Sequence, residues 1–233
     1  MGEAHVIGRT NSTNFPTVAA LQPSFGGGQF DVFVTKFAQD GQSLLYSTYL
    51  GGAGRDEDRN ISIASNGDAY IVGVTTSLNF PVVKALQSSH AGGAFDAFVL
   101  RLLADGSSLV FSTYLGGSGD DRVISIQPTA AGALFLAGLT NSVDFPTVDP
   151  IQPGFAGGLF DGFVAQLSPD GGSLHFSTYL GGTGHDRALE LDVDAAGNAY
   201  VVGFTDSTDF PTVNAIQPSN AGGVDAWLVK IGT

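Results

Sequence analysis

The chain has 233 residues, of which 43 % are apolar and 13 % charged, with no cysteine and a formal net charge of −13. This composition supports a substantial core and excludes disulfides, thiolate metal sites and thiol nucleophiles. The nine basic residues are scattered, so we expect no nucleic-acid partner. No apolar run is long enough for a membrane-spanning helix, so we expect no membrane insertion either.

A repeat of about 65 residues organises the whole chain. Its copies AHVIGRTNSTNFPTV, AYIVGVTTSLNFPVV, LFLAGLTNSVDFPTV and AYVVGFTDSTDFPTV begin at Ala4, Ala69, Leu134 and Ala199. The segment STYLGG recurs with the same spacing at Ser47, Ser112 and Ser177. The segment FDVFV at Phe30 also recurs, and its fourth copy, VDAWLV, arrives one residue early at Val224. One supersecondary unit is therefore expected to repeat along the chain.

Four strands follow one another in each unit. The unit after GGSGDD begins with the alternating segment RVISIQP at 122–128, and a turn at Gly132 leads to LFLAGLT at 134–140. A loop of about 20 residues precedes FDGFVAQLS at 160–168, and Asp170-Gly171 turns the chain into SLHFSTYLGG at 173–182. Asp-Gly pairs adopt the positive φ angles of tight hairpins. Four antiparallel strands at fixed spacing predict a propeller blade.

We therefore predict an all-β protein, a single β-propeller over residues 1–233 built from repeated four-stranded blades. The chain supplies about 3.5 blades, because the first blade lacks its first strand and the last lacks its fourth. Three arrangements stay open: a four-bladed ring closed on itself, a piece of a larger ring, or chains that complete one another in a homo-oligomer. We favour the two assembled arrangements, since closure of a ring removes exposed strand edges.

The segments STYLGGSGDD, GNAYVVGFTDSTDFP and GGAFDAFVLRL resemble the SBBP family, a bacterial β-propeller repeat. The resemblance covers essentially the whole chain. It implies a blade fold and a secreted or cell-surface setting in bacteria. It implies no known reaction and no catalytic residues.

The pattern G-G-x-G-x-D occurs at residues 51–56, 116–121 and 181–186 and is typical of calcium-binding β-rolls. In those rolls it repeats every nine residues or so, which stacks the turns. Because the copies here are a whole repeat apart, we favour a structural role in which the aspartate caps the turn between blades. A calcium site is the alternative, with candidate ligands Asp56, Glu57, Asp58, Asp121 and Asp186. Arg122 and Arg187 replace Glu57 in the later copies, which disfavours a site in every blade.

Four phenylalanines stand before prolines in the long loops: Phe15, Phe80, Phe145 and Phe210. As a functional site, they would form aromatic platforms for a glycan or a protein partner. As structural residues, each would pack its loop onto its own blade, and their strict repetition favours this second interpretation. The four histidines occupy four different repeat positions, which excludes a recurring histidine metal site.

No spacing suggests a catalytic motif, so we predict a non-catalytic scaffold or binding module, secreted or at the cell surface, without catalytic residues or a required cofactor. Its expected partners are a second copy, a glycan or a surface protein. The alternatives are a carbohydrate-active propeller hydrolase or lyase with an axial carboxylate site, and a structural subunit of a larger assembly.

Overall fold

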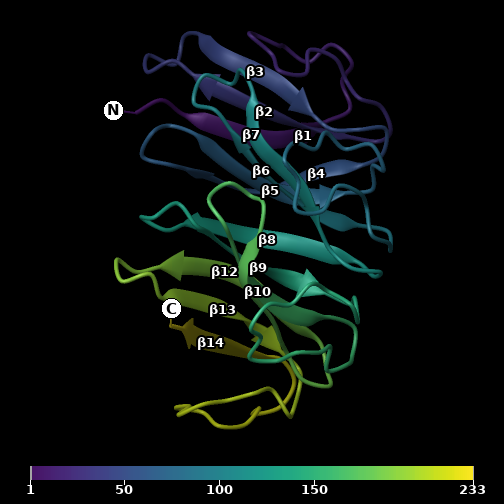
Figure 1. Cartoon of the computed structure of the whole chain (residues 1–233), viewed down its shortest axis with the longest axis vertical. Coiled ribbons are helices and arrows are strands. Elements are labelled where there is room, and N and C mark those ends of the chain that lie inside the picture. Colours follow the sequence, from purple (N-terminus) through teal and green to yellow (C-terminus); the bar gives the residue numbers. More distant parts are fainter. Residues whose placement is uncertain (1, 233) are drawn as a thin grey trace. The chain divides into compact units, whose positions relative to one another are not determined.

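The computed structural model describes residues 2–232, and the regular elements in this range are all antiparallel β-strands (Figure 1). They form four sheets with three, four, four and three strands. The predicted all-β fold of four-stranded blades is confirmed, including the shortened first and last sheets. No helix in this range is long and apolar enough to cross a membrane. The prediction of a single propeller over residues 1–233 stays a prediction.

Two compact units divide the chain, and Met1–His90 with Ala97–Leu115 forms the first. Its first sheet contains β1 (His5–Thr10), β2 (Asp31–Phe37) and β3 (Leu44–Leu50). Its second sheet contains β4 (Asp56–Ile63), β5 (Ala69–Thr75), β6 (Asp96–Leu102) and β7 (Leu109–Leu115). Strand β4 packs against β1 and β2, and buried side chains such as Val34, Ile71 and Phe98 share one hydrophobic cluster. The two sheets therefore bury a common core, as neighbouring propeller blades do.

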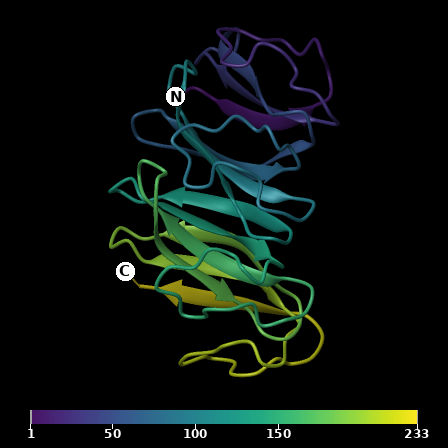
Figure 2. The same ribbon diagram turned by 45° about the vertical axis from the view of Figure 1, so that its right-hand side comes forward.

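The second unit, Ala91–Asp96 with Gly116–Thr233, repeats this plan. Its first sheet contains β8 (Asp121–Pro128), β9 (Leu134–Thr140), β10 (Asp161–Leu167) and β11 (Leu174–Leu180). Its second sheet contains β12 (Asp186–Val193), β13 (Ala199–Thr205) and β14 (Asp225–Ile231), all visible in Figure 2. Strand β12 packs on β8, β9 and β10, and its Leu191 joins a cluster with Val164 and Trp227.

The turns between third and fourth strands have the predicted geometry. Gly41, Gly106 and Gly171 follow aspartates and have φ angles of 67°, 73° and 75°. An L-residue with a side chain rarely adopts this conformation, whereas glycine does so at little cost. The Asp-Gly pairs thus act as the hairpin signals that the sequence indicated.

A glycine in each second strand lies beneath an aromatic ring of the third strand. At Gly73, a Cβ would lie 2.0 Å from the carbonyl oxygen of Glu57 and 2.5 Å from the Phe98 ring. The carbonyl belongs to β4, whose register shifts between Asp58 and Asn60. At Gly8 in β1, the three nearest atoms all belong to the Phe33 ring, at 2.7 Å and beyond. The backbone oxygen close to Gly73 therefore belongs to the first strand of its sheet. The sheet that contains Gly8 has no such strand.

Within residues 2–232, each shortened sheet has at one edge a strand whose counterpart is interior in the four-stranded sheets. Strand β1 pairs only with β2, and β14 pairs only with β13. An open edge presents backbone N–H and C=O groups to which another strand can bind. The first sheet is open on the side of a missing first strand, and the last on the side of a missing fourth strand.

Candidate functional site

The three glycine-aspartate turns (residues 51–56, 116–121 and 181–186) bind their own aspartates through hydrogen bonds. Asp121 has no exposed surface, and its Oδ2 accepts from the Gly117 amide at 2.8 Å and from the Ser142 hydroxyl at 2.7 Å. Its Oδ1 accepts from the Thr140 hydroxyl at 2.5 Å. Asp56 and Asp186 accept the equivalent turn amide and serine hydroxyl. The structure therefore gives these aspartates the capping geometry expected of a structural turn.

A second set of caps comes from the long loop that follows. The side chains of Asn79, Asp144 and Asp209 each accept a 2.8 Å hydrogen bond from the third residue of a turn. These backbone bonds hold the pKa of Asp144 and Asp209 below the ordinary value. Each turn is thus fastened to the blade that follows it in sequence, by a residue 26 positions downstream.

The structure does not gather the five candidate calcium ligands. Glu57 forms ion pairs with Arg9, Arg55 and Arg59. Asp56, Asp121 and Asp186 lie in separate turns, and the backbone carbonyl of Asp58 accepts from Arg59. Within residues 2–232, no group of three or more acidic or histidine side chains is arranged to hold a metal ion. Calcium binding therefore stays a prediction, and the described residues supply no ligand set for it.

We expect the melting temperature to be the same in millimolar calcium and in chelator. The N–H and hydroxyl donors around Asp56 and Asp121 already bind both oxygens of each carboxylate, and calcium needs six to eight oxygen ligands. Thermal unfolding followed by circular dichroism measures this directly. A calcium-dependent rise that disappears in Asp56→Asn would instead establish a calcium site at the first turn.

A second buried carboxylate, which could not be identified from the sequence, lies beside each turn. It belongs to the first residue of the third strand in the sheet that precedes the turn. Asp161 has no exposed surface, and its Oδ2 accepts from the Ala156 amide at 2.8 Å and from Gln152 Nε2 at 3.0 Å. Its Oδ1 has no hydrogen-bond partner among the described residues. A Cβ at Gly181 would lie 2.8 Å from Asp161 Oδ1 and 3.0 Å from Asp186 Oδ2. The two carboxylates therefore flank one glycine, and Gly51 lies in the same way between Asp31 and Asp56.

Burial of these carboxyl groups favours the protonated form. It raises the pKa of Asp161 to about 7, and the charge of Asp186 adds to this effect. Burial likewise raises the pKa of Asp31 and of Asp121 to about 6. A proton on Asp161 gives its Oδ1 a hydrogen to donate, which the ionised form lacks. Each carboxylate pair is therefore a buried site that takes up a proton close to neutral pH.

The four phenylalanines of the long loops pack on the third strands of their own sheets. Ring centroids are 4.5 Å apart for Phe15 with Phe33 and for Phe80 with Phe98, 4.4 Å for Phe145 with Phe163, and 5.3 Å for Phe210 with Trp227. Phe80 and Phe145 are only 3 % exposed, so neither ring offers a platform to a ligand. Phe15 and Phe210 are partly exposed. The packing is the one expected if each ring holds its loop on its blade.

The tyrosine of each STYLGG segment completes this packing. In the third sheet, the Tyr179 hydroxyl accepts from the Phe145 amide at 2.9 Å and donates to the Ser142 carbonyl at 2.7 Å. Its ring packs edge-on against Phe145 and tilted against Phe155. We call the site formed by Ser142, Phe145, Gln152 and Phe155 and their repeat equivalents the tyrosine seat. The sequence analysis did not identify this seat, although STYLGG is repeated exactly in the first three sheets.

Replacing Tyr114 by phenylalanine is expected to destabilise the protein by about 2 kcal/mol, because two buried backbone groups lose their partner. The Tyr114 hydroxyl accepts from the Phe80 amide and donates to the Ser77 carbonyl. Urea unfolding measures the change. Tyr200→Phe is the matched control, since that hydroxyl makes a longer bond, 3.2 Å to Asp194, at a partly exposed position. Equal effects of the two substitutions would contradict the structural role of the seat.

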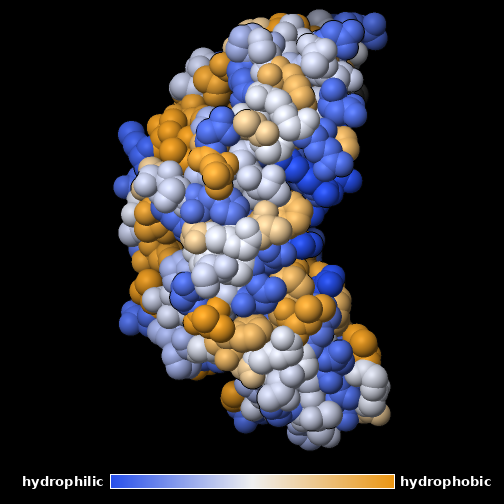
Figure 3. Space-filling model, turned by 90° about the vertical axis from the view of Figure 1, so that its right-hand side faces the viewer, coloured by the Kyte–Doolittle hydropathy of each residue, from blue (hydrophilic) through white to orange (hydrophobic). Residues whose placement is uncertain are grey.

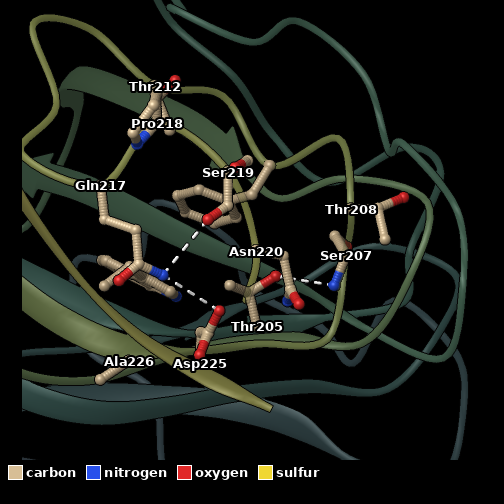
Figure 4. A pocket seen from close by; sticks show the side chains of 12 residues that line it. Thr205, Ser207, Thr208, Thr212, Gln217, Pro218, Ser219, Asn220, Asp225 and Ala226 are labelled. Atoms are coloured by element: carbon tan, nitrogen blue, oxygen red, sulfur yellow. Dashed lines mark hydrogen bonds between the residues drawn. The ribbon is translucent and has the colours of Figure 1, made fainter. Parts of the chain in front are cut away.

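The tyrosine seat of the fourth sheet is an open pocket (Figure 4). Ser207, Phe210, Gln217 and Asn220 occupy the repeat positions of the seat, and Asp225 and Trp227 of β14 line the same pocket. Gln217 Nε2 donates to the Ser219 carbonyl and to Asp225, both at 3.2 Å. No tyrosine from the described residues lies in this pocket.

Repeated antiparallel sheets of three or four strands, joined by capped turns and in three cases fastened by a tyrosine seat, define the chain as one built from β-propeller blades. Residues 45–81 match the family model of SBBP, described as a beta-propeller repeat. The match begins in β3 and passes through the turn at 51–56 to the Phe80 loop, so the predicted resemblance is confirmed over this stretch. No curated protein matches the chain.

Proposed function

We propose that the chain is a non-catalytic β-propeller module that offers a scaffold or binding surface outside the cell and requires no cofactor. One observation supports this proposal above the others. The carboxyl groups whose raised pKa would suit acid–base catalysis, Asp31, Asp121 and Asp161, have no exposed surface. A catalytic group has to reach its substrate, whereas these groups bind turn amides and side chains of their own blades.

The loop tips offer surfaces for a glycan or a protein partner. Leu78 and Val143 occupy the same position of the repeat and are 80 % and 73 % exposed. Figure 3 shows hydrophobic side chains in separate groups between polar ones on the face in view. The net charge of −13 favours neutral or cationic partners over anionic ones.

Two measurements test the proposal. Incubation of the protein with a panel of neutral, acidic and basic polysaccharides is expected to release no reducing ends and no unsaturated sugars. Release of either would overturn the non-catalytic role and favour a carbohydrate-active hydrolase or lyase. Protease treatment of intact producing cells is expected to remove the protein, and full protection by an intact membrane would overturn the extracellular location.

A further inference from the structure

The first glycine-aspartate turn leads into a cluster of charged residues that breaks the repeat. Glu57 of β4 forms ion pairs with three arginines, and we call the four residues the arginine cluster: Arg9, Arg55, Glu57 and Arg59. The other copies of the repeat have different residues at the arginine positions: Val74, Leu139 and Phe204 for Arg9, Asp120 and His185 for Arg55, and Ile124 and Leu189 for Arg59. Blades therefore form without these charges. Residues that depart from a repeat together, at one place, point to a function that the repeat itself does not supply.

The Glu57 carboxylate holds the three guanidinium groups together. Its Oε2 lies 2.7 Å from Arg9 Nη1 and 3.1 Å from Arg59 Nη2, while Nε and Nη2 of Arg55 bind Oε1. The Glu57 side chain is only 3 % exposed. Burial by itself would raise its pKa, but the hydrogen bond from Arg55 and the charges of Arg59 and Arg9 hold the pKa below the ordinary value. Glu57 is therefore ionised at neutral pH and fixes the arginines in place.

The arginine cluster carries a surplus of positive charge. Three guanidinium groups share one carboxylate, and a positive charge still remains when the neighbouring Asp58 is counted. The side chains of Arg55 and Arg59 are 39 % and 27 % exposed, so this charge reaches solvent. Because the chain has a net charge of −13, an anion can bind it only where positive charge is concentrated. Three of the nine basic residues lie in this cluster, which meets that condition.

The guanidinium groups are held in position before a ligand arrives. Besides its bond to Glu57, Arg9 lies over the Phe30 ring, with Cζ 5.6 Å from the ring centroid, and Arg59 Nη1 donates to the Asp58 carbonyl at 3.3 Å. Side chains that are already ordered lose little conformational entropy on binding. A guanidinium binds a carboxylate through two parallel N–H groups, so it suits a planar ligand with two oxygens. Phe30 is partly exposed and adds apolar surface beside Arg9.

From this geometry we infer that the arginine cluster binds the carboxylate of a uronic acid in an acidic polysaccharide. The inference rests on the proposed role as a binding module outside the cell and names its ligand. The guanidinium groups bind the carboxylate, and the apolar face of the sugar ring packs beside Phe30. A uronic acid suits the site better than an acidic peptide does, because its carboxylate is attached to a rigid ring. The side chain of a glutamate or aspartate would lose rotational freedom on binding.

Calorimetric titration of the intact chain with a short oligouronate tests this inference. The same oligouronate with its carboxyl groups methyl-esterified is the matched ligand control, because it keeps the sugar rings and loses the charge. We expect saturable binding of the free acid that weakens as the salt concentration rises. The ester should bind at least about tenfold more weakly. A short glutamate peptide, inorganic phosphate and sulfate should also bind at least about tenfold more weakly, since none combines a carboxylate with a rigid sugar ring.

Other copies of the repeat supply protein variants that suit the fold. Arg59→Ile copies the residue at position 124, and Arg9→Val copies the residue at position 74. We expect Arg59→Ile to weaken oligouronate binding at least about tenfold and Arg9→Val to weaken it several-fold, since each removes a guanidinium. Each variant leaves Glu57 paired with two arginines, so both should remain folded, which circular dichroism checks. If one variant failed to fold, the other would carry the test.

Lys84→Asn is the matched control for the loss of one positive charge. Lys84 lies in an exposed loop of the same unit, away from the arginine cluster in sequence, and has a φ angle of 46°. Asn214 adopts nearly the same angle, 49°, at the equivalent position, so the substitution suits the backbone. We expect it to change oligouronate affinity less than about twofold, because exposed charges act only weakly at a distance in salt.

Three results would overturn the inference: no binding of the free oligouronate by the folded chain, equal binding of the free acid and the methyl ester, or an equal loss of affinity in Lys84→Asn and in the cluster variants. Equal affinity for the glutamate peptide or for an inorganic anion would overturn the assignment to a uronic acid. Release of sugar fragments from a bound oligouronate would instead overturn the non-catalytic role and leave the binding site in place. Absence of oligouronate binding would leave the non-catalytic role standing, so the two proposals fail separately.

Discussion

Replacing Gly73 by alanine is expected to destabilise the protein by more than about 3 kcal/mol, because the new methyl group has no space. It would lie 2.0 Å from the Glu57 carbonyl oxygen, which is backbone, and 2.5 Å from the Phe98 ring. The clash can be relieved only if β4 or the Phe98 ring moves, and neighbouring residues hold both in place. Urea unfolding and amide exchange of the second sheet measure the effect.

Gly8→Ala is the matched control within the same unit. Gly8 occupies the equivalent position in β1, but its nearest contacts are the outer atoms of the Phe33 side chain at 2.7 Å. Rotation of that ring costs less than movement of a strand, so we expect a loss below about 1.5 kcal/mol. If Gly8→Ala proved as damaging as Gly73→Ala, the ring rather than the first-strand carbonyl would account for the requirement for glycine.

Replacing Asp161 by asparagine is expected to stabilise the protein at pH 8 by up to about 2 kcal/mol. The asparagine oxygen can accept from the Ala156 amide and Gln152, as Asp161 Oδ2 does, while its amide NH₂ replaces the Oδ1 that has no partner among the described residues. That amide would lie on the same side of Gly181 as Asp161 Oδ1 does now, and it carries no charge to repel the Asp186 carboxylate. The substitution therefore reproduces the protonated pair permanently. Urea unfolding at pH 5 and pH 8 measures the gain.

The same carboxyl group makes stability depend on pH in an unusual direction. Because the folded-state pKa of Asp161, about 7, exceeds its ordinary value of 3.8, its favourable contribution is complete below about pH 4 and is lost as the pH rises through 7. Ionisation of Asp161 therefore lowers the free energy of unfolding at pH 8, and this loss is the one that asparagine should recover. Asp31 and Asp121 act in the same direction around pH 6. The wild-type chain should thus be more stable at pH 5 than at pH 8, and Asp161→Asn should reduce this difference.

Asp170→Asn is the control, because folding lowers the pKa of Asp170 whereas it raises that of Asp161. Asp170 lies in an exposed turn, and bonds from Ser168 and Gly172 lower its pKa. Its stabilising contribution is present at neutral pH and is lost on acidification, so asparagine should bring no gain at pH 8. Destabilisation by Asp161→Asn at pH 8 would show that the buried pair is stable in its ionised form.

The sequence predicted the blades because their signals are local. Period-two apolar segments, Asp-Gly turns that begin at positions 40, 105 and 170, and a constant repeat spacing determine strand order and hairpin geometry without long-range information. The turn-capping role of Asp56, Asp121 and Asp186 followed from the same reasoning. These features depend on residues that lie close together in the chain.

The partners of those caps were not predictable in the same way. Asp161 begins β10 and Asp186 begins β12, and neither the spacing nor the residue type shows that they flank Gly181. The tyrosine seat joins residues 34 and 37 positions apart, and its hydroxyl bonds to backbone atoms that carry no residue-specific signal. The open seat at Trp227 became visible only through comparison of one folded blade with the next.

The tyrosine seat also sets an order of events during synthesis on the ribosome. Each long loop precedes its tyrosine in the sequence. Tyr114, the partner of the Phe80 amide and of the Ser77 carbonyl, is therefore synthesised 34 residues after Phe80 and 37 residues after Ser77. At about 5 to 20 residues per second of synthesis, this delay lasts on the order of seconds. Until Tyr114 is synthesised, these two backbone groups lack the partner that they have in the folded blade, so the loop gains its last fastening from the fourth strand.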